Sequence, residues 1–381
     1  MPGFKIDVGD WFAWSIRLNE VGLTNFYSNK FFSDYTPGYM YILYLLGFLK
    51  NLLRIDNNTF YLLLKLPAIL AELIISIIIY KEVKKKLSTS FAIIASSFIL
   101  FNPALIFNSS IWGQIDSVLT MCILLAAYFL KKNLLVLSSL ALGVAFLIKP
   151  QTIAIFPIFV LFLIRNFRVS NLAKLALPFL ATIFILSLPF FQTKPLTGLI
   201  ELVLKTADQY SYTSLFAYNF WGIIGFWITD TLKWHEISYR TIGYILFSVY
   251  WIVIAYSYLK GKLSIYALAA LALLGFYFLP TKVHERYLYP SLIFLLLTAF
   301  NLKSRLLFFL TTILSLIHFL NLYYVYVYYN EFYYKLPKLL YNPMVYNFLD
   351  NNGKLLSVLS TILFVLISIN IIKSNDATKK A

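Results

Sequence analysis

Carboxylate and amide side chains are grouped at a few points of an otherwise apolar chain. Asp7 and Asp10 stand near its start, Asp34 opens the segment Asp34-Tyr35-Thr36-Pro37-Gly38, and a second segment reads Trp112-Gly113-Gln114-Ile115-Asp116. Carboxylates can take up protons, and carboxylates and amides can both hydrogen-bond the hydroxyl groups of a ligand. Because such groups are expensive at membrane depth, their presence at the ends of apolar segments indicates a functional site.

Cationic side chains add a second kind of chemistry. Lys149 precedes Pro150-Gln151, and the run His284-Glu285-Arg286 lies between two apolar segments. Lysine, arginine and histidine can donate charge-assisted hydrogen bonds to an anion. These residues could therefore hold an anionic part of a ligand.

The elements that must position these residues are helices in a membrane. Hydrophobic residues make up 60% of the 381 residues, and the mean hydropathy is +0.77. The apolar runs, roughly 15 to 24 residues long, have about the length of membrane-spanning helices. They lack the alternation of a membrane barrel, and a helix satisfies its own backbone hydrogen bonds in lipid. We expect an all-α, polytopic integral membrane protein.

Eleven membrane spans are expected from these runs. They cover residues 60–80, 90–107, 117–130, 134–149, 152–165, 173–190, 239–259, 264–280, 287–301, 304–327 and 354–373.

Basic clusters orient the spans. They fall on every second loop, which the positive-inside rule makes cytoplasmic. The clusters are Lys81/Lys84/Lys85/Lys86, Lys131/Lys132, Arg165/Arg168/Lys174, Lys260/Lys262, Lys303/Arg305 and Lys373/Lys379/Lys380. These segments hold sixteen Lys and Arg against two acidic residues, whereas the outer segments hold fifteen against thirteen. The net charge of +16 is therefore a topology signal, and we expect no nucleic-acid partner.

Two further apolar stretches, 38–54 and 214–229, do not fit as spans, because counting either one would invert the basic clusters on one side of it. Their Tyr, Phe and Trp content suits helices that lie in the outer membrane interface. Nearly all the unusual polar residues then belong to outer loops.

Other features set limits on the class of protein. Cys122 is the single cysteine, so disulfides and cysteine-based metal sites are excluded. The first 36 residues contain no apolar core of a signal peptide. No linker separates a soluble domain, so residues 1–381 are expected to form one integral domain.

The ordered motifs resemble a known family. The first loop, with Asp7 ahead of Trp11-Phe12-Ala13-Trp14 and with the Asp34 segment, is similar to the start of GT-C superfamily glycosyltransferases. The later blocks resemble prokaryotic mannosyltransferases related to GPI mannosyltransferase II. These blocks are Lys65-Leu66-Pro67, Asn102-Pro103, Trp112-Gly113-Gln114-Ile115-Asp116, Lys149-Pro150-Gln151, Tyr218-Asn219-Phe220-Trp221 and His284-Glu285-Arg286-Tyr287.

The resemblance implies a GT-C-like fold and transfer of a hexose, with mannose as the expected sugar. The donor would be a polyprenyl-phosphate sugar, and the acceptor a hydroxyl of a lipid, glycan or protein at the extracytoplasmic face. The displacement would invert the anomeric carbon. Composition favours a prokaryotic plasma membrane. No cofactor is expected, and no metal, since a monophosphate donor lacks the diphosphate that usually requires one.

The resemblance also assigns roles to residues. Asp7 matches the catalytic Asp of the family's first loop, which takes the acceptor's proton; Asp10, three residues on, could share that face or be a solvated neighbour. Asp34 and Tyr35 are expected to line the substrate pocket, although an Asp before Thr-Pro-Gly is often only a helix cap or turn residue.

Other assignments also have alternatives. Gln114 and Asp116 are expected to hydrogen-bond a sugar or acceptor, or Asp116 caps the next helix. His284 and Arg286 are expected to bind the departing lipid phosphate, unless Arg286 only reaches lipid headgroups. Lys149 is expected to be a second phosphate ligand or a headgroup contact.

Asn219 is placed in the substrate site, beside tyrosines and tryptophans that form either a sugar platform or an ordinary interface belt. Tyr210, Tyr212, Tyr218 and Trp221 are the residues of this possible platform.

Two other functions fit an outer face rich in polar residues, and the start of the chain departs from the family. A ligase or polymerase of lipid-linked glycans would share the outer polar loops, and a lipid or sugar transporter would also carry intramembrane charges. Relatives carry a transmembrane helix before the first-loop Asp, whereas residues 1–6 alone precede Asp7. We therefore expect that the start site is misassigned, that the chain is a fragment, or that this helix is lost.

Overall fold

The computed structural model describes residues 3–28, 30–207 and 209–374. Lys379 and Lys380 of the last expected cytoplasmic cluster lie outside these residues. The chain divides into two compact units. Unit 1 comprises Met1–Ala71, Ser109–Phe156 and Phe162–Gln209, and unit 2 comprises Glu72–Asn108, Pro157–Leu161 and Tyr210–Ala381.

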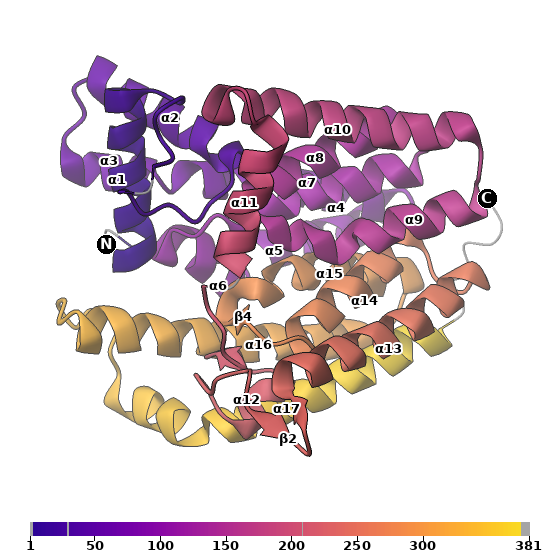
Figure 1. Ribbon diagram of the computed structural model, residues 1–381. Helices are drawn as coiled ribbons and strands as arrows, with labels where there is room; N and C mark the ends of the chain where they lie inside the picture. The colour runs from indigo at the N-terminus through magenta and orange to yellow at the C-terminus, as the bar shows by residue number, and fades with distance from the viewer. Residues whose placement is uncertain (1–2, 29, 208, 375–381) are drawn as a thin grey trace. The chain divides into compact units, whose positions relative to one another are not determined.

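Unit 1 is helical (Figure 1). It contains α1 (Lys5–Val21), α2 (Pro37–Leu52), α3 (Asn57–Leu63), α7 (Asp116–Lys131), α8 (Leu135–Ile148), η2 (Pro150–Ile155), both ends of α9 (Phe156–Arg165), α10 (Val169–Phe191), α11 (Pro195–Ala207) and the start of α4 (Leu66–Lys84).

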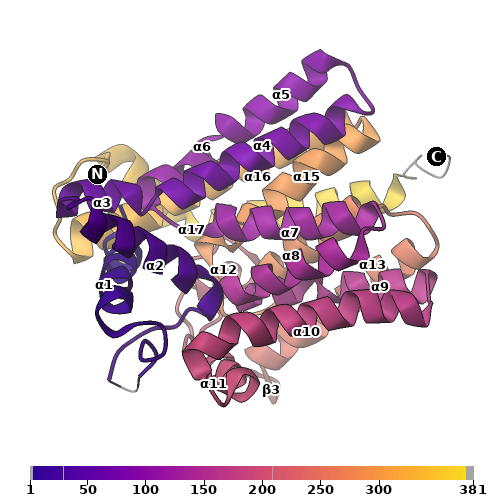
Figure 2. The same ribbon diagram turned by 90° about the horizontal axis from the view of Figure 1, so that it is seen from above.

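Small residues let the helices of unit 1 approach closely. Helix α8 packs between α7 and α10, as both ribbon views show (Figures 1 and 2). A Cβ atom added at Gly143 of α8 would lie 2.9 Å from Thr182 of α10. The same argument holds for Gly38 of α2, where an added Cβ would lie 2.6 Å from the Leu147 carbonyl of α8. This approach brings the start of α2 against the end of α8.

Unit 2 contains the remaining helices and four short strands (Figure 1). The elements before the strands are most of α4, α5 (Thr89–Leu100) and α6 (Pro103–Ile106). The rest are β1 (Ser214–Leu215), α12 (Phe220–Ile224), β2 (Lys233–Trp234), β3 (Ile237–Ser238), α13 (Tyr239–Leu259), α14 (Ile265–Phe278), β4 (Val283–His284), η3 (Glu285–Leu288), α15 (Tyr289–Leu302), α16 (Arg305–Val327), η4 (Tyr328–Tyr333) and α17 (Pro343–Lys373). The π-helix η1 (Phe107–Trp112) continues α6 and ends in unit 1.

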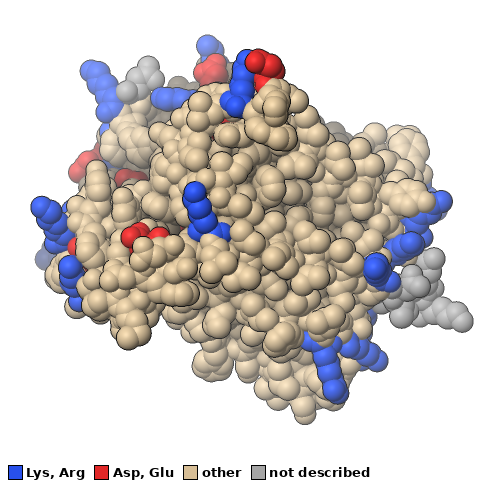
Figure 3. Space-filling view, turned by 90° about the horizontal axis from the view of Figure 1, so that it is seen from below, with Lys and Arg blue, Asp and Glu red and all other residues tan. Residues whose placement is uncertain are grey.

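The expected all-α membrane fold is confirmed, but the number of eleven spans is not. Each of the eleven expected ranges is largely helical. Six helical stretches of the described chain are long and apolar enough to cross a membrane: Asn57–Lys84, Thr89–Trp112, Val169–Phe191, Tyr239–Leu259, Arg305–Tyr333 and Pro343–Lys373. The chain is thus a multi-pass membrane protein. Uncharged side chains cover most of the face in Figure 3, as a lipid environment requires.

The expected interfacial helix at 214–229 is wrong. Only Phe220–Ile224 is helical there, and Ser214–Leu215 forms a strand that pairs in parallel with Val283–His284. The backbone cannot continue as a helix because Phe216 and Trp227 have positive φ angles of 62° and 57°. The other stretch, 38–54, does contain a helix, α2.

Candidate active site

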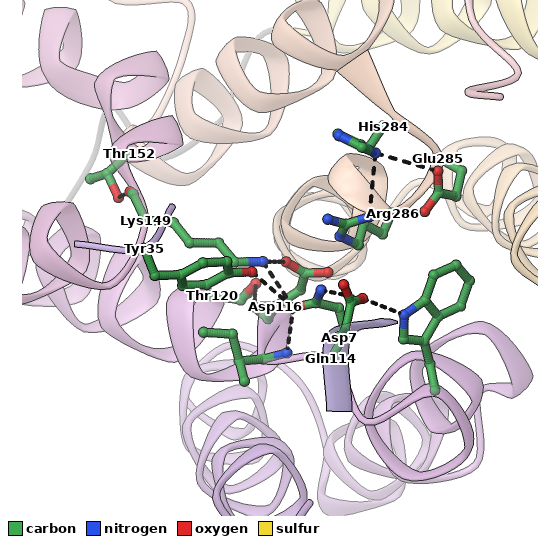
Figure 4. A network of polar contacts seen from close by, with 12 residues as sticks. Asp7, Tyr35, Gln114, Asp116, Thr120, Lys149, Thr152, His284, Glu285 and Arg286 are labelled. Atoms are coloured by element: carbon green, nitrogen blue, oxygen red, sulfur yellow. Dashed lines mark hydrogen bonds and ion pairs between the residues drawn. The ribbon is translucent and has the colours of Figure 1, made fainter. Parts of the chain in front are cut away.

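Asp7 lies in the first turn of α1 and is held from one side by the Trp112–Asp116 segment. Its Oδ2 accepts hydrogen bonds from Trp112 Nε1 at 2.6 Å and from Gln114 Nε2 at 2.8 Å (Figure 4). Within the described parts of the chain, no donor contacts Oδ1, and the residue is only partly buried. One oxygen of the carboxylate is therefore fixed and the other is available to a ligand.

The amide of Gln114 is fully buried and fixed in orientation. Its Oε1 accepts from Lys149 Nζ at 3.0 Å and from the Ile115 backbone N–H at 2.9 Å, and the Tyr35 hydroxyl lies 3.4 Å away. Since these groups donate, the amide oxygen must face them, and the NH₂ group must face Asp7. Gln114 thus joins Asp7 to Lys149.

Asp116 and Lys149 form a buried ion pair. The distance from Lys149 Nζ to Asp116 Oδ1 is 2.6 Å, and both side chains are less than 5% exposed. Asp116 is the first residue of α7, directly after the N-cap residue Ile115. The Lys149 ammonium also lies 5.3 Å from the centre of the Tyr35 ring. In this structure the Lys149 ammonium therefore has a carboxylate partner, Asp116, in addition to the Gln114 oxygen.

The start of α2 is tied to the end of α8, next to Lys149. The Thr36 hydroxyl donates to the Leu147 carbonyl at 2.7 Å, and the Tyr35 carbonyl accepts from the Tyr27 hydroxyl at 2.7 Å. The N-cap residue of α2 is Thr36, two positions after Asp34.

A second carboxyl group stands one helical turn from Asp7. Burial, together with the charges of Asp7 and Asp34, raises the pKa of Asp10 to about 7. The site therefore holds carboxyl groups in different environments, and Asp10 is partly protonated near neutral pH.

In unit 2, a parallel pair of strands presents the His284-Glu285-Arg286 run. The strand β4 pairs with β1, and the η3 helix begins at Glu285. Arg286 Nη1 donates to Glu285 Oε1 at 3.1 Å and lies 3.4 Å from His284 Nδ1 (Figure 4). The Arg286 and His284 side chains are 13% and 15% exposed, whereas Glu285 is buried. The two basic side chains thus contact the buried Glu285 and remain partly exposed.

Glu285 is an anion that organises this run. Burial alone raises the pKa of its carboxyl group, but the hydrogen bond from His284 and the charges of Arg286 and His284 lower the pKa below its usual value. A charged Glu285 favours the charged forms of both neighbours.

Asn219 has a structural set of partners. Its side chain is fully buried and caps α12, with Oδ1 accepting from the backbone of Trp221 and Gly222 at 3.1 Å. Its Nδ2 donates to the Tyr277 carbonyl at 2.9 Å. These contacts leave no exposed polar atom of Asn219 for a sugar.

The aromatic residues of this loop are divided between core and site. Tyr218 and Trp221 are buried, and the Trp221 indole N–H donates to the Leu279 carbonyl at 2.7 Å. Tyr210 instead packs edge-on against His284, with ring centres 5.3 Å apart. Of the predicted platform, Tyr210 is the residue placed beside a predicted ligand-binding group.

Asp230 and Arg240 form a pair that braces the loop before His284, and neither residue was predicted from the sequence. Buried Asp230 accepts two hydrogen bonds from Arg240, at 2.9 and 3.1 Å, and one from the Thr281 hydroxyl at 3.0 Å. These residues carry no motif, and their separation of ten positions gives no signal in the sequence. In the described chain no group of three or more His, Cys, Asp or Glu side chains could hold a metal ion.

Unit 1 therefore brings together Asp7, Tyr35, Gln114, Asp116 and Lys149, with Asp10 nearby on α1. Comparison with known proteins bears on this part of the chain. Residues 37–191 match the family model of dolichyl-phosphate-mannose-protein mannosyltransferases. The matched range covers less than half of the chain; it includes Gln114, Asp116 and Lys149 and excludes Asp7 and Arg286. No curated protein matches the chain. The match supports a GT-C type glycosyltransferase.

Proposed function

We propose that this protein transfers a hexose, with mannose as the expected sugar, from a polyprenyl-phosphate donor to an acceptor hydroxyl at the extracytoplasmic face of the membrane. The acceptor would be a lipid, glycan or protein. The family match supports the reaction class, and the likeness of the motifs to relatives of GPI mannosyltransferase II supports the finer assignment.

The observation that carries the proposal is the state of the Asp7 carboxylate. Two donors fix Oδ2, so Oδ1 keeps a defined direction and can accept the proton of an acceptor hydroxyl. The acceptor oxygen then attacks the anomeric carbon as the bond from that carbon to the phosphate oxygen breaks. Attack opposite to the leaving group inverts the anomeric centre.

The leaving group of this reaction is the polyprenyl phosphate, which gains negative charge as the bond breaks. We assign its stabilisation to Arg286 and His284, which are cationic or able to become so and are partly exposed. Preorganised donors of this kind stabilise charge as it develops in a transition state. Glu285 keeps both side chains oriented.

The remaining residues of unit 1 receive supporting roles. Asp34, Tyr35 and Asp10 are proposed to contact the sugar or acceptor, because all three side chains are partly exposed. The charges of Asp7 and Asp34 act on Asp10, and the Tyr35 hydroxyl lies 3.4 Å from the Gln114 side chain. Asp116 and Lys149 are proposed to hold the Gln114 amide in the orientation that serves Asp7.

The test is transfer of radiolabelled mannose from polyprenyl-phosphate-mannose by membranes that contain the full chain. Asp7→Asn should lower kcat by about 10² to 10⁴-fold with donor binding retained, because it removes the general base. The matched control is Asp56→Asn, which makes the same change at an exposed helix cap of unit 1. Arg286→Ala should also lower kcat, because it removes a donor that stabilises the negative charge on the departing phosphate.

Two outcomes would contradict the proposal. Full activity of Asp7→Asn would remove the proposed base. Transfer from oligosaccharide-diphosphate lipids, with none from any polyprenyl-phosphate sugar, would instead establish a ligase.

A further inference from the structure

The donors that hold Asp7 project from a segment of irregular backbone. Helical structure from Pro103 ends at Trp112, and Gly113 adopts a positive φ of 89°. The last carbonyl groups of a helix have no partner within the helix. At membrane depth such groups need donors from elsewhere in the protein.

Four successive carbonyls of this segment receive donors from three other parts of unit 1. Lys65 Nζ donates to the carbonyls of Ser110 at 2.8 Å and Ile111 at 3.3 Å. The Phe4 backbone N–H donates to the Trp112 carbonyl at 2.7 Å, and the Trp11 indole N–H donates to the Gly113 carbonyl at 3.2 Å. Trp112 bears one of these carbonyls and Gln114 follows the last of them. The side chains of both residues donate hydrogen bonds to Asp7.

Lys65 is suited to this position by its length and charge. The side chain is 5% exposed, and its methylene groups pass beside Gly3 and Gly113, where added Cβ atoms would lie 3.4 and 3.6 Å from Lys65 Cε. A cationic group is favourable at the negative, C-terminal end of a helix dipole. Both distances are ordinary van der Waals contacts, so the lysine stem packs alongside these two glycines as it reaches that end.

We propose that Lys65 is a positioning residue for the transfer reaction: it caps the carbonyls at the end of the 103–112 helical segment and thereby fixes the Trp112 and Gln114 donors on Asp7. This inference rests on the proposed role of Asp7 as the base. Lys65 itself makes no hydrogen bond to Asp7, so its effect passes through the segment that it caps.

The first test replaces the amine and keeps the stem, as Lys65→Met in the full chain. We expect kcat to fall by about 10²-fold, because displacement of a catalytic group by about 1 Å has an effect of this size. The loss should fall on kcat, since the donors that hold the Asp7 carboxylate in place are displaced. The KM for polyprenyl-phosphate-mannose should change little. The other charged groups facing this part of α1, Asp10 and Asp34, are unchanged in the variant.

The matched control is Ser138→Ala. Ser138 Oγ donates to the Ala126 carbonyl at 2.7 Å, so the variant also removes a buried side-chain-to-carbonyl hydrogen bond in unit 1, but between α7 and α8. It should lower thermal stability and leave kcat in place. A merely structural Lys65 would behave in the same way as this control, and that result would overturn the proposal.

Hydrogen exchange tests the cap without relying on activity. In Lys65→Met, amides of residues 107–115 should exchange faster, while those of α8 keep their protection. Unchanged exchange at 107–115 would contradict the proposal even if Asp7 proved not to be the base. If Lys65→Met does not fold, Trp11→Phe removes another donor of the same set and should lower kcat with little change in KM. An unchanged kcat would count against the cap.

Discussion

At the residue scale, the Gln114 amide is the link between an ion pair and the proposed base. Lys149 donates to its oxygen, and its NH₂ group donates to Asp7. Asp116 in turn holds the Lys149 side chain in place. An uncharged side chain at position 149 would leave the oxygen of Gln114 with a weaker partner and Asp116 with an uncompensated charge.

The effects of substituting Lys149 and Asp116 on the free energy of unfolding should therefore be strongly coupled. Lys149→Met leaves a buried carboxylate unpaired, which typically costs about 3 to 5 kcal/mol. Adding Asp116→Asn to Lys149→Met should recover part of this loss, because the amide carries no charge. Thermal unfolding in detergent of both single variants, the double variant and the parent protein measures the coupling. Additive losses in the double variant would show that the pair is not coupled.

Asp10 should make stability fall as pH rises. Its pKa is about 7 in the folded chain against an ordinary value of 3.8, so between these values the folded state binds a proton that the unfolded state has released. Stability is thus greatest below about pH 4 with respect to this group, declines toward pH 7 and is at its lowest above it. Asp10→Asn removes this titration, so its thermal midpoint should exceed that of the parent by more at pH 8 than at pH 5.

The size of this difference should be on the order of 2 °C or more. Asp56→Asn is the control, because hydrogen bonding from Thr59 lowers the pKa of Asp56 and places its titration below this pH range. An equal difference at pH 5 and pH 8 for Asp10→Asn would show that Asp10 does not titrate as expected.

At the element scale, the crossing of α2 over the end of α8 depends on Gly38. A Cβ at this position would meet the carbonyl carbon and oxygen of Leu147 at 2.6 Å, and backbone atoms cannot move aside cheaply. Gly38→Ala should therefore separate the two helices and weaken the bond from Thr36 to Leu147. We expect a loss of about 1 to 3 kcal/mol, as for other overpacked sites.

Gly9 offers a control of opposite sign. It lies inside α1, and an added Cβ would meet nothing within 4 Å. Gly9→Ala should stabilise the chain by about 0.5 to 1 kcal/mol, because alanine loses less conformational entropy in a helix. The difference between the two thermal midpoints measures the steric effect, and a stabilising Gly38→Ala would refute the close approach.

Apolar runs predicted the helices well and the loop at 214–229 badly. The expected span 239–259 coincides with α13, and 304–327 differs from α16 by one residue. In the loop, aromatic residues are buried against their own unit, and Asn219 starts a short helix that ends before Gly225, whose φ is 157°. Composition reports that a residue is apolar but not whether lipid or protein covers it.

At the scale of the whole molecule, the pairings within the site could not be predicted from the sequence. Asp7 and Trp112 are 105 positions apart, and Lys149 and Asp116 are 33 apart. Motifs marked these residues as unusual, but which side chain neutralises which depends on how the helices pack. Lys149 illustrates the difference, since the sequence suggested a phosphate and the structure provides Asp116.

The path of the chain through the membrane is the largest-scale prediction. Helix α14 has 14 residues, or roughly 21 Å at 1.5 Å per residue, which is less than a hydrocarbon core of about 30 Å. Other short helices are extended: η3 and α15 together run without a break from Glu285 to Leu302. Basic clusters at every second loop favour eleven crossings, whereas helix length alone identifies six.

Two exposed acidic residues distinguish these topologies. Six expected spans lie between Glu20 and Glu236 in the eleven-span topology, which places both on the outer face; three of the six long helices lie between them, which would place them on opposite faces. Cys122 is buried and is the single cysteine, so Glu20→Cys and Glu236→Cys can be made separately in a Cys122→Ala background. We expect a membrane-impermeant maleimide to label both variants in intact cells, and Asn133→Cys only after lysis. Labelling of Glu20→Cys but not of Glu236→Cys in intact cells would instead support six crossings. Four of the six long helices lie between Asp7 and His284, so both topologies keep these two residues on one face, and the labels decide only the number of crossings before Glu236.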